Sequence, residues 1–472
     1  MNCGIDFGTR NTAIVKGERR VTGVSGNTIP SFVAYSRMGL PRRIGETAKD
    51  LLGDPALATD WDVERSFKVR LVDGVGGLRT PMSVTADFLS DALRLPSAGG
   101  EPVTRAIMAI PVAWPPTARA ALRTAALKAG IPVSGFVSES TAAFARHRDN
   151  FGAVQQVAVF DWGAGTLDIS VLRIRGGLHG ARSIEELRCA SSDSAGDAVD
   201  DLLAQHLHRQ LQVGDPRLPA WGEVDRADKD RLRHQAELAK MVLSGGRPPT
   251  AIPITLARYC GGIRNMSLSI RDFESAVEPV INSAVRTLQE ALKRAEIAIE
   301  TDLDVLLVVG GSSKLRGLEA RLRETFGDKL FMTKESDWDV AEGAKRIAEA
   351  GEGCYTCVQE FHLMLSDGLS LPLTQPGAPF DGRPAGHVVG KVDESPVASL
   401  VFGERPIGTH RAPIVVGGLT VPSQGLPGEP IEIEARLDPD LFLRVEAWPM
   451  LGLRHVDQRI FEFPHTRFEY RL

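Results

Sequence analysis

Two short turns in the sequence combine an aspartate, an aromatic residue and small residues in a pattern that suits phosphate chemistry. Residues 157–172 read as an apolar strand, a turn holding Asp161 and Thr166, and a second strand that alternates apolar and polar residues. Residues 3–15 repeat this form around Asp6. Glycine or alanine in such a turn lets backbone N–H groups approach a phosphate closely. Because each turn leads into a strand rather than a helix, the pattern differs from a Walker loop. We expect two half-sites that face one phosphate chain.

Two charged residues elsewhere in the chain have the chemistry to complete such a site. Lys68 offers an ammonium that can neutralise a terminal phosphate and orient the attacking water. Glu139 begins the helix expected after the strand at 133–137, where the helix dipole favours a carboxylate that can also bind a metal-bound water. On spacing alone, a solvated surface lysine and a simple first-turn acid stay open as alternatives.

A third set of residues suits the nucleoside end of a nucleotide. Glu237, Lys240 and Ser244 share one face of the polar helix expected over 228–244, because their spacings are three and four. They can contact ribose hydroxyls and a base, or they can form an i,i+3 salt bridge on a solvated face. The diglycine turn at 310–312, between a buried strand and a helix start, is a further cradle for a nucleoside or an α-phosphate.

Bulk composition narrows the class of protein. The chain has 472 residues, a formal net charge of −5, 43% hydrophobic and 24% charged residues. These values predict a globular protein of several domains without the electrostatic footprint of nucleic-acid binding. No apolar stretch approaches the length of a membrane span, and the N-terminus runs straight into a strand without a secretory signal. Together with five scattered cysteines, this favours a cytoplasmic protein with neither a membrane nor a nucleic acid as partner.

The character of the chain changes near residue 354, where prolines, glycines and short alternating strands replace the helical patterns. This predicts an all-β module with no long helix. The apolar stretch at 359–367 is either a linker that docks on a partner surface or the first strand of that module. We interpret Cys354 and Cys357 as reduced, unreactive thiols, because no second Cys-x-x-Cys or paired histidines complete a zinc site.

The order of these motifs resembles the actin-like ATPase superfamily and, within it, the heat-shock protein 70 chaperones. The closest stretches are residues 109–114 with 118–120, 139–143, 160–168 and 308–314. The resemblance implies an α/β fold: a two-lobed actin-like ATPase domain at 1–350, a linker at 351–368, and a β-sandwich substrate-binding-like domain without a helical lid at 369–472.

The resemblance also implies a nucleotide site for ATP or ADP with Mg²⁺, in which Asp6 and Asp161 hold the metal through water. The implied catalytic residues are Asp6, Lys68, Glu139, Asp161 and Thr166. The implied nucleotide-binding residues are Gly8, Thr9, Arg10, Asn11, Gly163, Ala164, Gly165, Gly196, Glu237, Lys240, Ser244, Gly310, Gly311, Ser312, Lys314 and Asp337. The family's adenine-stacking arginine is Met241 here, and its switch proline is Ser140.

The function implied is an ATP-hydrolysing chaperone that couples nucleotide state to the binding of peptides. Its partners would be unfolded or extended clients, or one dedicated protein, with a possible co-chaperone. The altered residues keep a second reading open: a nucleotide-sensing scaffold with little turnover and a single dedicated partner.

Overall fold

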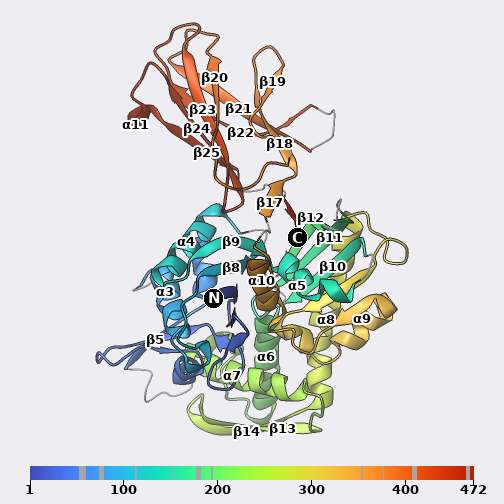
Figure 1. Cartoon of the computed structure of the whole chain (residues 1–472). Coiled ribbons are helices and arrows are strands. Elements are labelled where there is room, and N and C mark those ends of the chain that lie inside the picture. The colour runs from blue at the N-terminus through green and yellow to red at the C-terminus, as the bar shows by residue number, and fades with distance from the viewer. Residues whose placement is uncertain are drawn as a thin grey trace. The chain divides into compact units, whose positions relative to one another are not determined.

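The computed structural model describes eleven stretches of the chain (Figure 1), namely residues 1–52, 60–73, 79–111, 114–151, 154–176, 182–192, 195–351, 354–375, 377–406, 412–463 and 468–471. They form two compact units. Unit 1 comprises Met1–Val112, Ala121–Arg173 and Leu187–Glu349, and unit 2 comprises Ala113–Ala120, Ile174–Glu186 and Ala350–Leu472. Among the described residues, no helix combines the length and the apolar character that a membrane crossing requires.

The first sheet of unit 1 carries the N-terminal turn. Its strands follow the order β3-β2-β1-β8-β9, with β4 paired to β2. Their bounds are β1 Asn2–Phe7, β2 Asn11–Lys16, β3 Arg19–Val21, β4 Ile29–Pro30, β8 Arg105–Ile110 and β9 Val133–Ser138. β1 and β2 are antiparallel neighbours, whereas β1, β8 and β9 run parallel. The turn between β1 and β2 therefore lies at the carboxyl edge of the parallel strands, as does the start of α5 (Glu139–His147).

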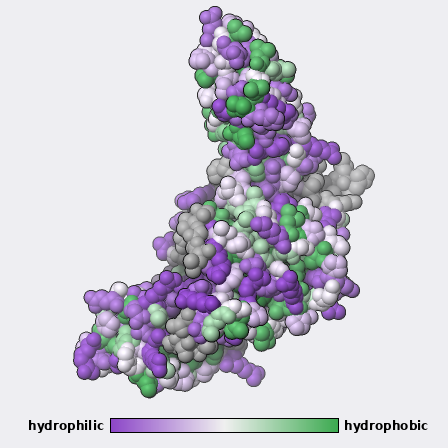
Figure 2. Space-filling view, turned by 90° about the vertical axis from the view of Figure 1, so that its left-hand side faces the viewer, coloured by the Kyte–Doolittle hydropathy of each residue, from purple (hydrophilic) through white to green (hydrophobic). Residues whose placement is uncertain are grey.

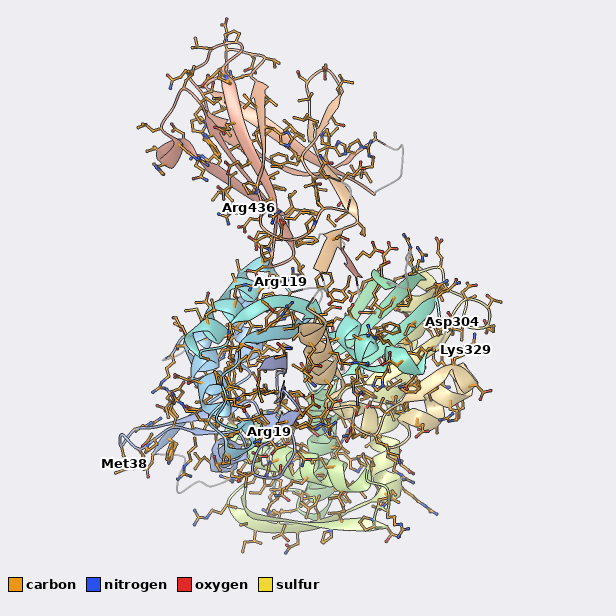
Figure 3. The ribbon with its side chains drawn as sticks, in the orientation of Figure 1. Arg19, Met38, Arg119, Asp304, Lys329 and Arg436 are labelled. Carbon is orange, nitrogen blue, oxygen red and sulfur yellow. The ribbon has the colours of Figure 1, made fainter. Side chains whose placement is uncertain are left out.

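A second sheet of unit 1 repeats this arrangement around the central turn. β10 (Gln156–Trp162) and β11 (Leu167–Gly176) are antiparallel, and β10 runs parallel to β15 (Val305–Val309), which runs parallel to β16 (Leu330–Met332). Asp304, which Figure 3 labels at the edge of this sheet, accepts the N–H groups of Gln155 and Gln156 at 2.7 and 2.9 Å. Both expected strand–turn–strand elements are confirmed.

Helices flank these sheets, and two of them cross very closely (Figure 1). The helices of unit 1 not yet given are α1 Glu46–Lys49, α2 Phe67–Asp73, α3 Pro81–Ala92, α6 Gly196–Gly214, α7 Arg226–Leu243, α8 Ile270–Arg294, α9 Leu318–Phe326 and α10 Asp339–Ala350, while α4 Pro116–Lys128 belongs partly to each unit. A Cβ on Gly343 of α10 would lie 1.8 Å from the carbonyl oxygen of Ala142 in α5. Only glycine permits this crossing, which holds α5 and its first residue in place.

Short strands complete unit 1 beside the helices. A three-stranded sheet has the order β6-β5-β7, and β13 pairs with β14 as a separate hairpin. Their bounds are β5 Phe32–Ser36, β6 Arg43–Ile44, β7 Trp61–Arg65, β13 Ala251–Tyr259 and β14 Gly262–Ser269. One hydrophobic core of the unit packs α6, α7 and α8 against β10, β11 and β15.

Unit 2 is all-β over its C-terminal part. One four-stranded sheet has the order β19-β18-β21-β22, and a second has the order β20-β23-β24-β25. The bounds are β18 Gln359–Met364, β19 Ser370–Pro372, β20 Ala385–Gly390, β21 Val397–Pro406, β22 Ile414–Pro422, β23 Pro430–Asp438, β24 Phe442–Pro449 and β25 Arg459–Phe463. The expected all-β module is confirmed, and its single described helix, α11 (Arg454–Asp457), is one turn long.

The stretch expected as a linker at 351–368 is largely strand. β17 (Cys354–Cys357) pairs with β26 (Phe468–Arg471), which in turn pairs with residues 183–185 of β12 (Arg182–Ser192). β18 pairs with β21, so the alternative of a first strand of the β module agrees with the structure. The physical reason is burial: Phe361 and Leu363 face the core of the module and are almost inaccessible to solvent.

Candidate nucleotide site

The two Asp-containing turns meet in unit 1. A Cβ added to Gly165 would lie 3.3 Å from the side chain of Thr9, so the second turn contacts the first. In the first turn, a Cβ on Gly8 would lie 2.0 Å from the carbonyl oxygen of Asn11. Ser31, between β4 and β5, donates its Oγ hydrogen to the Gly8 carbonyl at 2.8 Å and so braces that turn. Close backbone approach therefore requires glycine at position 8, whereas Gly165 lies in tight contact with a side chain.

The start of α6 and the diglycine turn join the central turn. The N–H groups of Gly196 and Asp197 donate to the carbonyls of Gly163 and Ala164 at 3.2 and 2.7 Å. Ser312 Oγ donates to the same Gly163 carbonyl at 2.7 Å. The central turn, the start of α6 and the diglycine turn lie far apart in the sequence. These hydrogen bonds hold their backbones together.

A buried ion pair lies beside these turns. Lys68 Nζ donates to Glu139 Oε1 at 2.9 Å, and both side chains are buried. Lys68 is held in place because the neighbouring Phe67 packs its ring 5.7 Å from Phe7 of β1 and anchors α2. Glu139 is held because Ser138 caps α5 by accepting the Thr141 N–H at 3.0 Å. The alternative of a solvated lysine is wrong, and Glu139 does more than occupy a first turn.

Asp161 and Gly310 are in contact at the end of β15. Gly310 has a φ of 85°, and a Cβ there would lie 2.5 Å from Asp161 Oδ1. Thr166 Oγ1 donates to Asp168 Oδ2 at 2.6 Å, which orients the hydroxyl of the central turn. We refer to Asp6, Lys68, Glu139, Asp161 and Asp168 as the charge cluster.

Negative charge exceeds positive charge in the charge cluster. Loss of solvation, reinforced by Glu139, raises the pKa of Asp6 to about 7 although Lys68 opposes the shift. Loss of solvation likewise raises the pKa of Asp161 well above its usual range and raises that of Glu139. Burial lowers the pKa of Lys68, but the surrounding carboxylates outweigh this and raise it overall. Lys68 therefore stays protonated, whereas its single positive charge under-compensates the carboxylates of Asp6, Glu139 and Asp161.

This donor set fits a hydrated divalent cation. Magnesium prefers oxygen ligands and usually keeps several of its waters. Within the described stretches, no three acidic, histidine or cysteine side chains converge closely enough to hold a metal directly. Asp6 and Asp161 therefore suit a cation that they contact through water.

A second group of ion pairs includes three with a carboxylate that lines a cavity of about 250 Å³, namely Asp197, Asp200 and Glu237. We refer to it as the paired rim; its pairs are Arg10–Asp197 at 2.9 Å, Lys49–Glu237 at 2.8 Å, Lys240–Asp200 at 2.7 Å, and Lys314 with Asp337. Glu237 and Lys240 of α7 pair with Lys49 and Asp200 of other elements, so the alternative of an i,i+3 salt bridge between these two residues is not the arrangement that forms. Burial raises the pKa of Glu237, yet Lys49, Lys240 and Arg10 outweigh it and hold that pKa low.

The remaining nucleoside-end candidates fall near this rim. Lys240 Nζ also donates to the Gly196 carbonyl at 3.2 Å, and Ser244 Oγ accepts the Arg316 N–H at 3.3 Å. A Cβ on Gly311 would lie 2.8 Å from Asp337 Oδ1. Each expected site residue thus lies in unit 1, on one of the turns, on α2, α5 or α7, or immediately beside them.

Four residues of the site did not stand out in the sequence. Asp168 and Asp197 lie inside motifs that did, and Asp200 follows Asp197 by one helical turn. Their acidic spacing was a usable signal. Lys49 ends the short helix α1, and nothing in its local sequence distinguishes it from a surface lysine.

Two residues that depart from the family pattern have clear environments. Ser140 is buried, and its hydroxyl donates to Ser170 Oγ at 2.7 Å, which ties α5 to β11. Met241 lies on α7 next to Lys240 and is largely exposed.

The Cys357 thiol is buried and donates to the Gln359 carbonyl at 3.4 Å, whereas the Cys354 side chain lies outside the described residues.

The family of the chain follows from comparison with known proteins. The model of the Hsp70 protein family matches residues 58–383, which is more than half of the sequence. This chain belongs to the Hsp70 family. Its α/β unit has the actin-like ATPase fold of that family, followed by a β-rich region.

Individual Hsp70-family relatives are chaperones of bacteria. A "Chaperone protein HscA homolog" of Acidithiobacillus ferrooxidans is 30% identical over 303 residues, covering 63% of this chain and 45% of the relative. Proteins of the same name from Pseudoalteromonas atlantica and Burkholderia cenocepacia are 26% and 28% identical, covering 73% and 72% of this chain and 58% and 57% of their own. The chain thus spans about half the length of these relatives.

Proposed function

We propose that this chain binds and hydrolyses ATP and couples its nucleotide state to the binding of peptides or of a protein partner. The observation that carries the proposal is the buried Lys68–Glu139 pair beside Asp6 and Asp161. Membership of the Hsp70 family and relatives named as chaperones support the same activity.

The proposed chemistry is positioning and charge neutralisation without a covalent intermediate. Lys68 would lie against the terminal phosphate, and Glu139 would orient the attacking water. Mg²⁺, held through water by Asp6 and Asp161, would neutralise phosphate charge when bound. The Thr166 hydroxyl, which donates to Asp168 in the structure, would instead donate a hydrogen bond to the γ-phosphate. The backbone of Gly8 to Asn11 and of Gly163 to Gly165 would bind phosphate oxygens.

The paired rim would receive the nucleoside. Glu237, Lys240 and Ser244 would contact ribose and base, with Gly196, Gly310, Gly311 and Ser312 allowing close backbone approach. Lys314 and Asp337 would border the base. The β-rich part of unit 2 would bind the peptide or protein, and a co-chaperone would act on the cycle.

Steady-state phosphate release by the purified full chain tests this proposal. It is measured with and without an unfolded apolar peptide, beside an Asp161→Asn variant as the inactive reference. We expect turnover that depends on Mg²⁺, rises with peptide and is lost in the variant. ATP binding without turnover above that reference would contradict the proposed hydrolysis, and turnover indifferent to peptide would contradict the proposed coupling.

A further inference from the structure

The cavity beside the paired rim is lined almost entirely by ionisable side chains. Figure 2 shows hydrophilic and hydrophobic groups interspersed over the side of unit 1 that carries α3 and β5. In contrast, only Phe32, Leu52 and Ser66 among the residues that line this cavity of about 250 Å³ lack an ionisable side chain. A cation in such a cavity is available to a charged ligand only if the chain leaves some of its donors unused.

Arg10 lines this cavity and keeps donors that its ion pair does not use. Its Nε donates to Asp197 Oδ2 at 2.9 Å, and Oδ1 lies at the same distance. Within the described part of the chain, its terminal nitrogens, Nη1 and Nη2, have no hydrogen-bond partner, and neither is shut off from solvent. These two nitrogens form the planar fork with which arginine binds two oxygens of one phosphate.

The Arg10 side chain is held between the first turn and the start of α6. The Ser31 N–H donates to the Arg10 carbonyl at 2.6 Å, which fixes the backbone of the residue. Asp197, which engages the Nε, is itself fixed because its N–H donates to the Ala164 carbonyl of the central turn at 2.7 Å. The fork is therefore oriented before a ligand arrives, and little side-chain freedom is lost when one binds.

Arg10 lies toward the nucleoside end of the proposed site. Burial lowers the pKa of Arg10, but three carboxylates of the paired rim outweigh it and raise that pKa overall, namely Asp197, Glu237 and Asp200. Lys68, which is proposed to lie against the terminal phosphate, is instead surrounded by the charge cluster. Because Arg10 also belongs to the turn whose backbone would bind phosphate oxygens, its fork falls between the terminal phosphate and the nucleoside.

We propose that the Arg10 fork binds the β-phosphate of the nucleotide, so that the site selects nucleoside di- and triphosphates over monophosphates. This inference rests on the proposed nucleotide binding and adds the residue that sets the preference for phosphate-chain length. Asp197 orients the guanidinium, yet its negative charge opposes the incoming phosphate at short range. An asparagine at this position would keep an acceptor for the Nε and remove the opposing charge.

The test compares nucleotide affinities of the full chain and four variants in the presence of Mg²⁺. Arg10→Gln removes the fork, Arg10→Lys keeps the charge without the fork, and Asp197→Asn removes the opposing carboxylate. The matched control is Arg65→Gln, because Arg65 lines the same cavity, is 27% exposed against 29% for Arg10, and is engaged with Asp230 at 3.2 Å. ADP, AMP and the non-hydrolysable β,γ-imido analogue of ATP are measured by competition against a fluorescent ADP analogue.

We expect Arg10→Gln to weaken binding of ADP and of the ATP analogue alike, by at least about tenfold. Its affinity for AMP should change by less than about twofold, which also shows that the site remains folded. Arg10→Lys should recover only part of the loss, since an ammonium cannot bind two oxygens side by side. Asp197→Asn should bind ADP at least as tightly as the parent, and Arg65→Gln should stay within about twofold of it.

Equal losses for AMP and ADP, a loss for the ATP analogue alone, or an equal loss in Arg65→Gln would overturn the inference. So would an Asp197→Asn variant that loses as much ADP affinity as Arg10→Gln, because the ion pair would then act only by holding the chain together. If the parent and Arg10→Gln bind ADP equally, this inference fails while the proposed nucleotide binding stands. A parent chain that binds no ADP contradicts both.

Discussion

The charge cluster and the paired rim use similar residues in opposite ways. In the cluster, Lys68 is the sole ammonium among four carboxylates, and the pKa values of Asp6 and Asp161 rise. Around the rim, each cation has its own carboxylate; the pKa of Glu237 falls, whereas burial raises the pKa of Asp200 to about 6 although Lys240 opposes the shift. The charge cluster is therefore short of positive charge, whereas each cation of the paired rim already has a carboxylate partner.

This difference indicates where the binding free energy of a nucleotide arises. A cation entering the charge cluster relieves repulsion among poorly solvated carboxylates, so it gains more than an ion pair at a solvated surface. A nucleoside entering the paired rim must replace ion pairs that already exist, so it gains little net electrostatic free energy. We expect Mg²⁺ and the phosphates to dominate affinity, and the rim to adjust it.

Removing the ammonium of the charge cluster should have the largest effect. Lys68→Met should reduce the rate of ATP hydrolysis by at least about 100-fold, because a single electrostatic group at a reacting centre carries that much. Affinity for ADP should change far less, since Lys68 is proposed to lie against the terminal phosphate. Phosphate release and calorimetric titration measure the two effects.

The matched control for this variant is Lys293→Met on the exposed side of α8. It should leave the rate of hydrolysis unchanged. Parental hydrolysis in Lys68→Met would show that the charge cluster is not the reacting centre.

Neutralising one carboxylate of the cluster should stabilise the chain in the absence of nucleotide. The Asp6 pKa is about 7 in the folded chain, against its ordinary value of 3.8, so folded Asp6 holds its proton more tightly. Its destabilisation of the fold develops as pH rises from about 4 to 7 and is complete above pH 7. Asp6→Asn should therefore raise stability at pH 8 by about 1–3 kcal/mol and have little effect at pH 4.

Urea unfolding of the parent and the Asp6→Asn variant at both pH values measures this difference. Equal stabilisation at the two pH values, or a loss of stability at pH 8, would mean that the ionised carboxylate is adequately compensated in the folded chain.

Breaking a pair of the rim should have the smallest effect. Lys49→Ala and Glu237→Ala remove a partly exposed ion pair, and such pairs contribute about 0.2–1 kcal/mol to stability. A double-mutant cycle at low and at high salt isolates the coupling. A coupling free energy between Lys49 and Glu237 above that range, or one that does not change with salt, would contradict this expectation. The paired rim would then resemble the charge cluster, and the difference between the two regions would disappear.

The sequence predicts the fold well wherever hydrophobic periodicity is strong. The helix expected over 228–244 is α7, Arg226–Leu243, and both strand–turn–strand elements form around Asp6 and Asp161. The stretch at 359–367 was ambiguous because a short apolar run suits either an exposed linker or a buried strand. Only the tertiary pairing of β18 with β21 decides between them.

The candidate site is predictable in its residues but not in its pairings. Asp6, Lys68, Glu139 and Asp161 are identifiable from their motifs and order, yet no local pattern shows that Lys68 is buried against Glu139. Lys49 approaches Glu237 from 188 residues away, so no spacing in the sequence connects them. Such contacts depend on the packing of elements that are distant in the chain.

The most direct test of this contrast is a calorimetric titration of the chain with ADP, once in the presence of Mg²⁺ and once in EDTA. The titrations are made near pH 6.5 in buffers of different ionisation enthalpy. We expect Mg²⁺ to strengthen binding by at least about tenfold, with release of protons as the cation favours the ionised forms of Asp6 and Asp161. Equal affinity in EDTA and no proton release would contradict the account, because the charge cluster would then need no cation.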